Sequence, residues 1–233
     1  MPSLKKALNS QVGKKLMTGI TGVFLMLFLI GHLAGNLTIF AGSETFNKYT
    51  YRLESLGPLL YLIEAVLAFI FIYHAILGIS IAINRKKARP NGYYTYKSRG
   101  GQSHQSLASR SMVITGIIIL VFLVLHIAQF KFGATGTIMS SDGHELRDLR
   151  PLVINTFTNP IYVIGYVFVL AMIILHLSHG FWSAFTSLGM QHNSFSKKMQ
   201  MAAYIFAIVL MLGFMFIPVY IYLTGGTGSL ISY

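Results

Sequence analysis

The sequence predicts an all-α integral membrane protein, and three observations support this. Of the 233 residues, 54% are hydrophobic and only 10% are charged, whereas a soluble domain carries about 25% charged residues. The apolar residues gather into five long runs. Each run is long enough to cross the roughly 30 Å hydrocarbon core of a bilayer as a helix. This pattern excludes an ordinary soluble enzyme and a disordered chain, and the runs are too long for barrel strands.

Five spans are expected in a single transmembrane domain that covers residues 1–233. Helix-starting residues support their limits, since Gly57-Pro58 precedes the second span and Asn159-Pro160 precedes the fourth. The first apolar run exceeds the 7–15 residues of a signal peptide's apolar region, so we expect an uncleaved first span. The predicted spans are Leu16–Phe40, Leu59–Ile83, Met112–Phe130, Ile161–Leu188 and Met201–Leu223.

The distribution of basic residues predicts the orientation of the chain. The 18 Lys and Arg exceed the 6 Asp and Glu, which leaves a net charge of +12. If the N-terminus lies in the cytoplasm of a bacterial cell, the segments on the outer side of the membrane hold only five basic residues: Lys48, Arg52, Lys131, Arg147 and Arg150. The other basic residues then lie on the cytoplasmic side. Because Lys and Arg collect on the cytoplasmic side, we expect this orientation in the cytoplasmic membrane. The net charge is therefore mostly a consequence of this topology in a lipid membrane, although a basic cytoplasmic surface could also bind a cytoplasmic partner. No nucleic-acid partner is expected.

Histidines inside the spans are the main functional signal. The chain has no cysteine, so a metal would have to be held by His, Met or carboxylate side chains. His32, His74 and His126 lie in the first three spans, and His176 and His179 lie in the fourth. An ionisable side chain within a span is costly and usually faces the bundle interior. One such histidine could simply be hydrogen-bonded to a neighbouring helix, but a histidine on each of four consecutive spans indicates a shared site.

The depths of these histidines predict two pairs. At 1.5 Å per residue, His32 and His126 lie about 25 Å from the cytoplasmic ends of their spans, and His74 and His176 lie about 18 Å from theirs. The first two histidines would form an outer pair and the other two an inner pair. Zinc or copper would require three or four protein ligands, and no carboxylates accompany these histidines. Haem requires only two axial ligands and has an apolar macrocycle, so two bis-histidine haems b are expected.

Four short runs around these histidines resemble the haem-ligand segments of a known family. They are FLIGHLAGN (Phe28–Asn36), FIYHAILG (Phe71–Gly78), VLHIAQ (Val124–Gln129) and LHLSHGFWSAF (Leu175–Phe185). The family is the single-chain, five-helix, dihaem cytochrome b558 membrane subunit of bacterial succinate dehydrogenases and fumarate reductases. The resemblance covers essentially the whole chain, including the basic loop between the second and third spans and the histidine-free fifth span.

This resemblance implies a membrane anchor for a flavoprotein and an iron–sulfur subunit. The succinate site would lie on a partner, and electrons would reach this chain from the iron–sulfur subunit and pass to a quinone, menaquinone by resemblance. His74 and His176 would bind the inner haem, and His32 and His126 the outer one. The family pattern favours His176 over the nearby His179, which would otherwise be the alternative ligand.

One acidic residue, Glu64, lies within a predicted span. A carboxyl group there is either a proton relay for a quinone site near the outer haem or a structural group that is hydrogen-bonded to a neighbouring span. Two other functions remain open from the sequence: a cytochrome b anchor of another dehydrogenase, and a cofactor-free transporter whose histidines relay protons.

Overall fold

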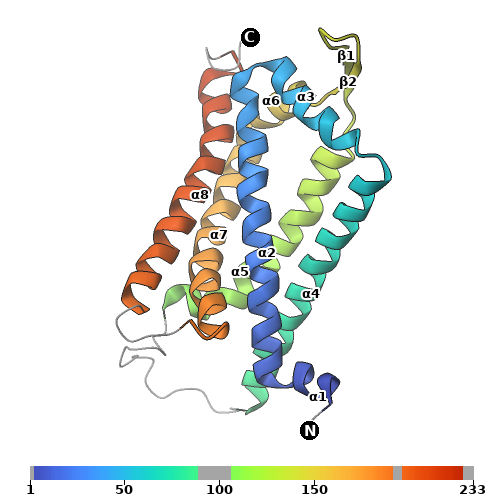
Figure 1. The fold of residues 1–233 in the computed structure, drawn as a ribbon. Helices are drawn as coiled ribbons and strands as arrows, with labels where there is room; N and C mark the ends of the chain where they lie inside the picture. The colour runs from blue at the N-terminus through green and yellow to red at the C-terminus, as the bar shows by residue number, and fades with distance from the viewer. Residues whose placement is uncertain (1–2, 89–105, 191–195, 228–233) are drawn as a thin grey trace. The chain divides into compact units, whose positions relative to one another are not determined.

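The computed structural model describes residues 3–88, 106–190 and 196–227 (Figure 1). The basic segment expected between the second and third spans lies outside the described residues from position 89 to 105. Helices dominate the described chain, and one small antiparallel hairpin accompanies them. The elements in chain order are α1 (Leu4–Asn9), α2 (Gln11–Leu37), the 3-10 turn η1 (Thr38–Ala41), α3 (Ser43–Glu54), α4 (Pro58–Ala88), α5 (Leu107–His126), the π-helical turn η3 (Ile127–Lys131), β1 (Gly136–Met139), β2 (Glu145–Asp148), α6 (Arg150–Phe157), α7 (Pro160–Ser187) and α8 (Ser196–Thr224).

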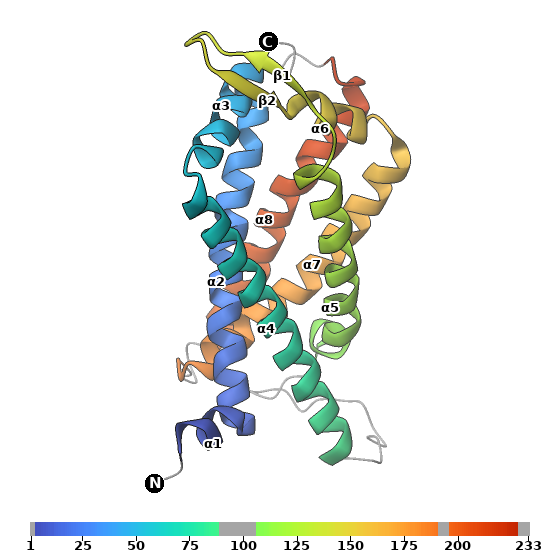
Figure 2. The same ribbon diagram turned by 90° about the vertical axis from the view of Figure 1, so that its right-hand side faces the viewer.

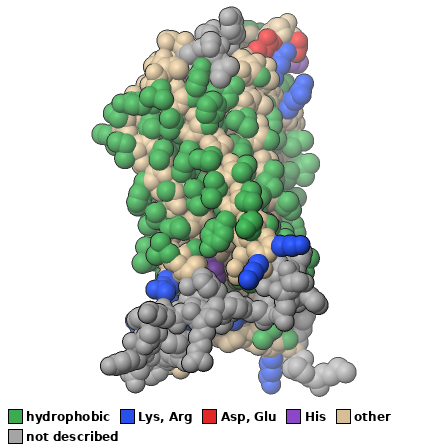
Figure 3. All heavy atoms as spheres, turned by 90° about the vertical axis from the view of Figure 1, so that its left-hand side faces the viewer, with side chains coloured by type: hydrophobic (Ala, Val, Ile, Leu, Met, Phe, Trp, Pro, Cys, Tyr) green, Lys and Arg blue, Asp and Glu red, His purple; other side chains and the backbone are tan. Residues whose placement is uncertain are grey.

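Five of these helices are long and apolar enough to cross a membrane: α2, α4, α5, α7 and α8. Large apolar side chains on them remain exposed, as Phe69, Ile164 and Leu223 do. In the face shown in Figure 3, hydrophobic side chains cover the helices, while charged side chains lie away from this apolar surface. Lipid is the solvent that such a surface requires. The prediction of an all-α, five-span integral membrane protein is confirmed.

Local sequence explains where two of the long helices begin. Gly57 has a positive φ of 54°, a conformation that glycine adopts without steric cost, and α4 begins at the next residue, Pro58. Before α7, the Asn159 side-chain oxygen accepts a hydrogen bond from the amide of Ile161 at 3.0 Å. Proline in the first turn suits a helix start because its missing N–H would have no partner there.

The chain divides into two compact units, and every long helix contributes to both. Unit 1 comprises Met1–Leu27, Leu67–Ile118 and Met172–Ile208. Unit 2 comprises Phe28–Val66, Ile119–Ala171 and Val209–Tyr233.

Small and aromatic residues pack the helices of unit 1. A Cβ atom at Gly19 of α2 would lie 3.4 Å from the backbone of Ala184 in α7, so the two helices approach closely, as small residues allow in membranes. The Phe181 ring contacts the Phe206 ring of α8 with centroids 5.2 Å apart. Lys14 of α2 donates a hydrogen bond to Ser80 of α4 at 2.7 Å.

Unit 2 has an apolar core beneath a cap of short elements. The core contains Ile39, Phe46, Val153, Phe157, Val163, Ile217 and Ile221.

In Figure 2, α3, α6 and the hairpin lie side by side at one end of this unit. Strands β1 and β2 pair antiparallel, with Thr137 opposite Arg147. The buried Asn47 of α3 donates to Asp148 at 2.8 Å and accepts from the amide of Leu149 at 3.3 Å. The sequence did not predict this hairpin, because its strands are only four residues long.

A polar cluster joins α3 to the turn between the strands. Lys48 forms ion pairs with Glu44 at 3.0 Å and with Asp142 at 2.8 Å, and Ser141 hydrogen-bonds to Glu44. The Ser141 hydroxyl, together with Lys48, lowers the pKa of Glu44 to about 2. Lys48 likewise lowers the pKa of Asp142, and Asp142 with Glu44 raises the pKa of Lys48.

Candidate functional site

The structure brings four of the intramembrane histidines together as two pairs, one in each unit. In unit 1, the rings of His74 (α4) and His176 (α7) have centroids 6.4 Å apart. In unit 2, the rings of His32 (α2) and His126 (α5) have centroids 5.8 Å apart. All four side chains are partly buried. Each pair joins two helices that are not consecutive spans of the chain.

These separations suit two imidazoles that bind one metal ion from opposite sides. Nitrogen–metal bonds of about 2 Å on both sides place the two ring centroids about 6 Å apart. Within the described residues, no three His, Asp or Glu side chains gather as ligands for a bare ion. A planar macrocycle that supplies its own in-plane ligands therefore fits these sites better than a bare metal ion does.

Hydrogen bonds determine which nitrogen of His74 can bind a metal. The Thr21 hydroxyl of α2 donates to its own helix, at 2.8 Å from the carbonyl of Met17. Its oxygen lies 3.0 Å from Nδ1 of His74, and with its proton already used it can only accept. With the Thr21 proton on the carbonyl of Met17, this contact assigns a proton to Nδ1 of His74 and the lone pair to Nε2. This is the arrangement in which protein metal ligands are usually held.

The second histidine of unit 1 is held in the same way. The Thr115 hydroxyl of α5 donates to the carbonyl of Ser111 at 3.0 Å and lies 3.1 Å from Nδ1 of His176. Thr115 is only 1% exposed, so no bulk water competes for this bond. Both imidazoles in unit 1 thus present Nε2 as their free nitrogen.

A glycine follows each of these threonines and leaves room beside the histidine rings. A Cβ atom at Gly22 would lie 3.4 Å from Cε1 of His74, and one at Gly116 would lie 3.5 Å from Cε1 of His176. A longer side chain at either position would extend into the space beside the ring. The backbones of α2 and α5 therefore lie close beside the histidine rings of this pair.

Aromatic rings surround the pair in unit 2. Phe28 stacks on His32 with centroids 5.3 Å apart, and Phe122 stacks on His126 at 5.4 Å. Phe214 of α8 lies 5.7 Å from His32. The planes of the two imidazoles cross at 89° here and at 60° in unit 1. An apolar lining of this kind suits the face of a large planar ligand.

His179 lies almost one turn beyond His176 on α7 and is also partly buried. The ring that contacts His74 is that of His176. This geometry favours His176 as the ligand, and it leaves His179 as a neighbour of the site.

Glu64 has a partner that the sequence did not predict. Its carboxylate forms an ion pair with Lys131, the last residue of η3, and both side chains are 39% exposed. The Lys131 ammonium also lies 6.0 Å from the centre of the Tyr61 ring. A cavity of about 560 Å³ adjoins this pair and is lined by Glu54, Gly57, Leu60, Tyr61, Lys131, Phe132, Gly133 and Arg147.

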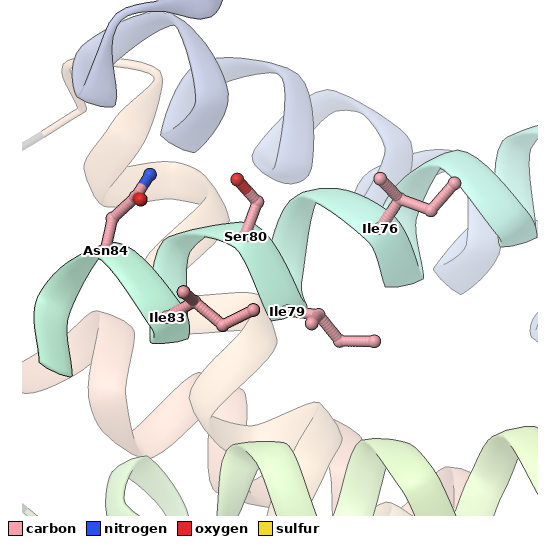
Figure 4. A pocket seen from close by; sticks show the side chains of 5 residues that line it. All are labelled: Ile76, Ile79, Ser80, Ile83 and Asn84. Atoms are coloured by element: carbon pink, nitrogen blue, oxygen red, sulfur yellow. The ribbon is translucent and has the colours of Figure 1, made fainter. Parts of the chain in front are cut away.

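A second, shallower groove runs along α4 in unit 1, with a volume of about 310 Å³. Figure 4 shows Ser80 and Asn84 pointing to one side of the helix, and Ile79 and Ile83 to another. Its lining contains no histidine, so the groove is separate from the pair in unit 1.

The roles of Thr21 and Thr115 were not predicted from the sequence, although a repeated spacing points to both residues. Thr21 stands eleven residues before His32 in α2, and Thr115 stands eleven residues before His126 in α5. Each is preceded by Ile and followed by Gly. The same residues at the same spacing indicate that α2 and α5 have equivalent roles.

The histidines of α4 and α7 can be compared in the same way, although here the corresponding residues differ. Glu64 stands ten residues before His74, and Tyr166 stands ten residues before His176. Tyr166 is another residue that the sequence analysis missed, and it lies 3.1 Å from Nδ1 of His126. Glu64 therefore occupies the position in α4 that corresponds to Tyr166, a histidine-contacting residue, in α7.

A curated protein resembles this chain over most of its length. The succinate dehydrogenase cytochrome b558 subunit of Bacillus subtilis (strain 168) is 30% identical to it over 159 residues. The aligned region covers 67% of this chain and 69% of that protein. No family model matches the chain, and no solved structure matches it.

Proposed function

The chain belongs to the family of succinate dehydrogenase cytochrome b558 subunits, and on this basis we propose that it is the dihaem membrane anchor of a succinate:quinone oxidoreductase. In this role it transfers electrons from an iron–sulfur subunit, through two bis-histidine haems b, to a membrane quinone. Succinate is oxidised on a partner flavoprotein, so this chain contributes to an enzyme without holding the succinate site. The resemblance of its haem-ligand segments favours menaquinone as the acceptor.

The observation that carries the proposal is the hydrogen bonding of the histidines in unit 1. The hydroxyls of Thr21 and Thr115 lie 3.0 and 3.1 Å from Nδ1 of His74 and His176, and with both hydroxyls as acceptors the two Nε2 atoms are free to bind one iron. His74 and His176 would hold the inner haem, and His32 and His126 the outer one. When bound, haem b would supply reversible one-electron transfer, and these four histidines would hold it.

The protein's own contribution at these sites is orientation and exclusion of water. Each threonine holds one imidazole in a fixed tautomer, which also increases the basicity of the ligand nitrogen. The glycines beside the inner pair let the backbones of α2 and α5 lie close to the rings with no side chain between them, and the phenylalanines of unit 2 keep the outer pair apolar. Low polarity around a metal site limits solvent access and influences its potential.

The ion pair of Glu64 and Lys131 supports an outer quinone site. A quinone needs an apolar slot and a group that can exchange a proton at its carbonyl oxygen. Glu64 does not line the 560 Å³ cavity itself but is ion-paired to Lys131, which does. The cavity has mixed walls, with Leu60, Tyr61 and Phe132 on its apolar side and charged side chains elsewhere. In the proposed reaction, Glu64 passes a proton to or from the quinone oxygen, while Lys131 stabilises the carboxylate between transfers.

The proposal also includes the place of the chain in the cell. We expect one transmembrane domain over residues 1–233, since α2, α4, α5, α7 and α8 each continue from one unit into the other. Its N-terminus would be cytoplasmic in a bacterial cytoplasmic membrane. Lys14, Lys15, Arg85, Lys86 and Lys87 would then lie on the side where the flavoprotein and iron–sulfur subunits bind.

A reduced-minus-oxidised visible spectrum of the purified protein, with pyridine haemochrome quantification, tests the proposal. We expect two haems b per chain with low-spin bands, and co-purification of a flavoprotein and an iron–sulfur protein. Other co-purifying redox subunits would indicate an anchor for a different dehydrogenase. A colourless, folded protein extracted from membranes would overturn the electron-transfer function and favour a transporter.

The role of Glu64 is tested by Glu64→Gln in the assembled complex. We expect slower succinate:quinone turnover with unchanged haem content, and an unchanged rate with an artificial acceptor that takes electrons from the soluble subunits. Glu145→Gln, a carboxylate change on strand β2, is the matched control. Normal quinone turnover in the Glu64 variant would remove this residue from the mechanism.

A further inference from the structure

A chain of hydrogen bonds leads away from His126 through unit 2. Nδ1 of His126 lies 3.1 Å from the Tyr166 hydroxyl. That hydroxyl donates to the side-chain oxygen of Gln129 at 3.1 Å, and the Gln129 amide donates to the Thr156 hydroxyl at 3.2 Å. The four residues come from α5, α7, η3 and α6, elements that converge in unit 2 (Figure 2).

The direction of these bonds, with the Gln129 amide nitrogen toward Thr156 and its oxygen toward Tyr166, favours one tautomer of His126. With its amide nitrogen turned to Thr156, Gln129 offers its oxygen to Tyr166, and an amide oxygen only accepts. The proton of Tyr166 is therefore used on Gln129, and the phenol oxygen accepts the Nδ1 proton of His126. Nε2 of His126 is left with the free lone pair.

Three phenylalanines hold the Tyr166 ring in place. Phe122 and Phe157 contact it edge-on, each with centroids 5.0 Å apart, and Phe130 does so at 6.2 Å. Edge-to-face contacts at these distances are favourable aromatic arrangements. The hydroxyl therefore has a fixed position relative to His126.

Its partner His32 has a different environment. The Asn36 side-chain nitrogen lies 3.4 Å from each ring nitrogen of His32 and donates to the His32 carbonyl at 2.7 Å. That nitrogen is a donor, so it cannot accept an imidazole proton. The two histidines of this pair are thus held unequally, whereas both histidines in unit 1 are held by threonines.

We propose that Tyr166, oriented by Gln129, is a positioning residue for the haem ligand His126, and that it influences the reduction potential of this haem alone. The inference rests on the proposed haem ligation. An acceptor at Nδ1 makes the imidazole a stronger electron donor, which stabilises ferric over ferrous iron. Removal of this acceptor shifts the midpoint potential of the His32–His126 haem to a more positive value.

The test is a redox titration of the purified complex that carries Tyr166→Phe, after its haem content has been measured. We expect two haems per chain, one midpoint shifted positive and the other unchanged. The low-spin ferric EPR signal of the shifted haem should change with it, because this signal depends on ligand orientation. Tyr162→Phe makes the same chemical change one turn earlier on α7, at a side chain that is 45% exposed, and should alter neither midpoint.

Two haems with unchanged midpoints and EPR signals in Tyr166→Phe would overturn the inference and leave the phenol with a packing role. If that variant loses the haem altogether, Gln129→Leu decides the question, because it retains the phenol ring and removes only the group that orients its hydroxyl. A shift confined to one haem in Gln129→Leu supports the inference, and no shift refutes it. A lack of haem in the unmodified complex would instead contradict the proposed function.

Discussion

Replacement of Thr115 by valine removes one hydroxyl from the inner site and leaves the shape of the side chain nearly unchanged. The Thr115 oxygen accepts the Nδ1 proton of His176 at 3.1 Å, and the threonine is buried to 1% exposure. In Thr115→Val the imidazole N–H has no acceptor at this position, and bulk water cannot replace the hydroxyl. We therefore expect weaker haem binding with little change in helix packing.

The size of the effect follows from the burial of this bond. A buried donor left without its acceptor costs about 1–3 kcal/mol, and each 1.4 kcal/mol corresponds to about a tenfold change in an equilibrium constant. Loss of an outer-shell partner lowers metal affinity about 10–100-fold in other proteins. We expect a loss of similar size in the affinity of the inner haem.

The assay follows haem transfer from the purified protein to an excess of a haem-scavenging protein, recorded in the visible spectrum. Faster loss should be confined to one of the two haems. Thr115→Ser keeps the acceptor and should retain the haem as the unmodified protein does. Ser111→Ala is the second control, because it removes a hydroxyl of the same helix that hydrogen-bonds only within that helix, to the carbonyls of Leu107 and Ala108, and it should have no effect. Equal retention in Thr115→Val and the unmodified protein would refute the role assigned to this hydroxyl.

Three further predictions concern other contacts. The pKa of Glu44 is lowered to about 2 in the folded protein, so its stabilisation of the hairpin is complete above its ordinary pKa of 4.5 and is lost as the pH falls toward 2. Hydrogen exchange of the hairpin amides should show this loss of protection. In Glu44→Gln, protection should depend less on pH over the same range. Gly22→Leu should abolish binding of the inner haem, because a Cβ atom at this position would lie 3.4 Å from the His74 ring and the leucine side chain extends further. Gly22→Ala should retain that haem. Equal haem content in both variants would contradict the steric explanation. Asn47→Ala leaves Asp148 without a buried partner and should destabilise unit 2 by about 1–3 kcal/mol, seen as a lower melting temperature in detergent; an unchanged value would show that water satisfies the site.

The fold class was accessible from sequence because lipid imposes a simple requirement. A chain in hydrocarbon must satisfy every backbone hydrogen bond internally, so the five long apolar runs had to be helices. Gly57-Pro58 and Asn159-Pro160 marked where two of these helices begin. The short elements were not accessible in this way. The hairpin of unit 2 is held by contacts such as that of Asn47 with Asp148, and these residues are far apart in the chain.

The histidine pairs show the same division. Depth along each span depends only on residue number and helical rise, so His74 with His176, and His32 with His126, could be proposed as pairs before any contact was known. The acceptors of their Nδ1 protons depend on how one helix is rotated against the next. Thr115 reaches His176 from another helix, and the spacing of the chain alone does not specify that rotation.

By itself, the sequence determined that this protein crosses a membrane five times and carries histidines within four of its spans, since both properties follow from the composition and order of residues. Only the tertiary structure decided that Thr21, Thr115 and Tyr166 hold the histidine tautomers, and that Lys131 pairs with Glu64. Hydrogen bonds and ion pairs act over about 3 Å, and side chains forty or more residues apart come that close only when the helices pack.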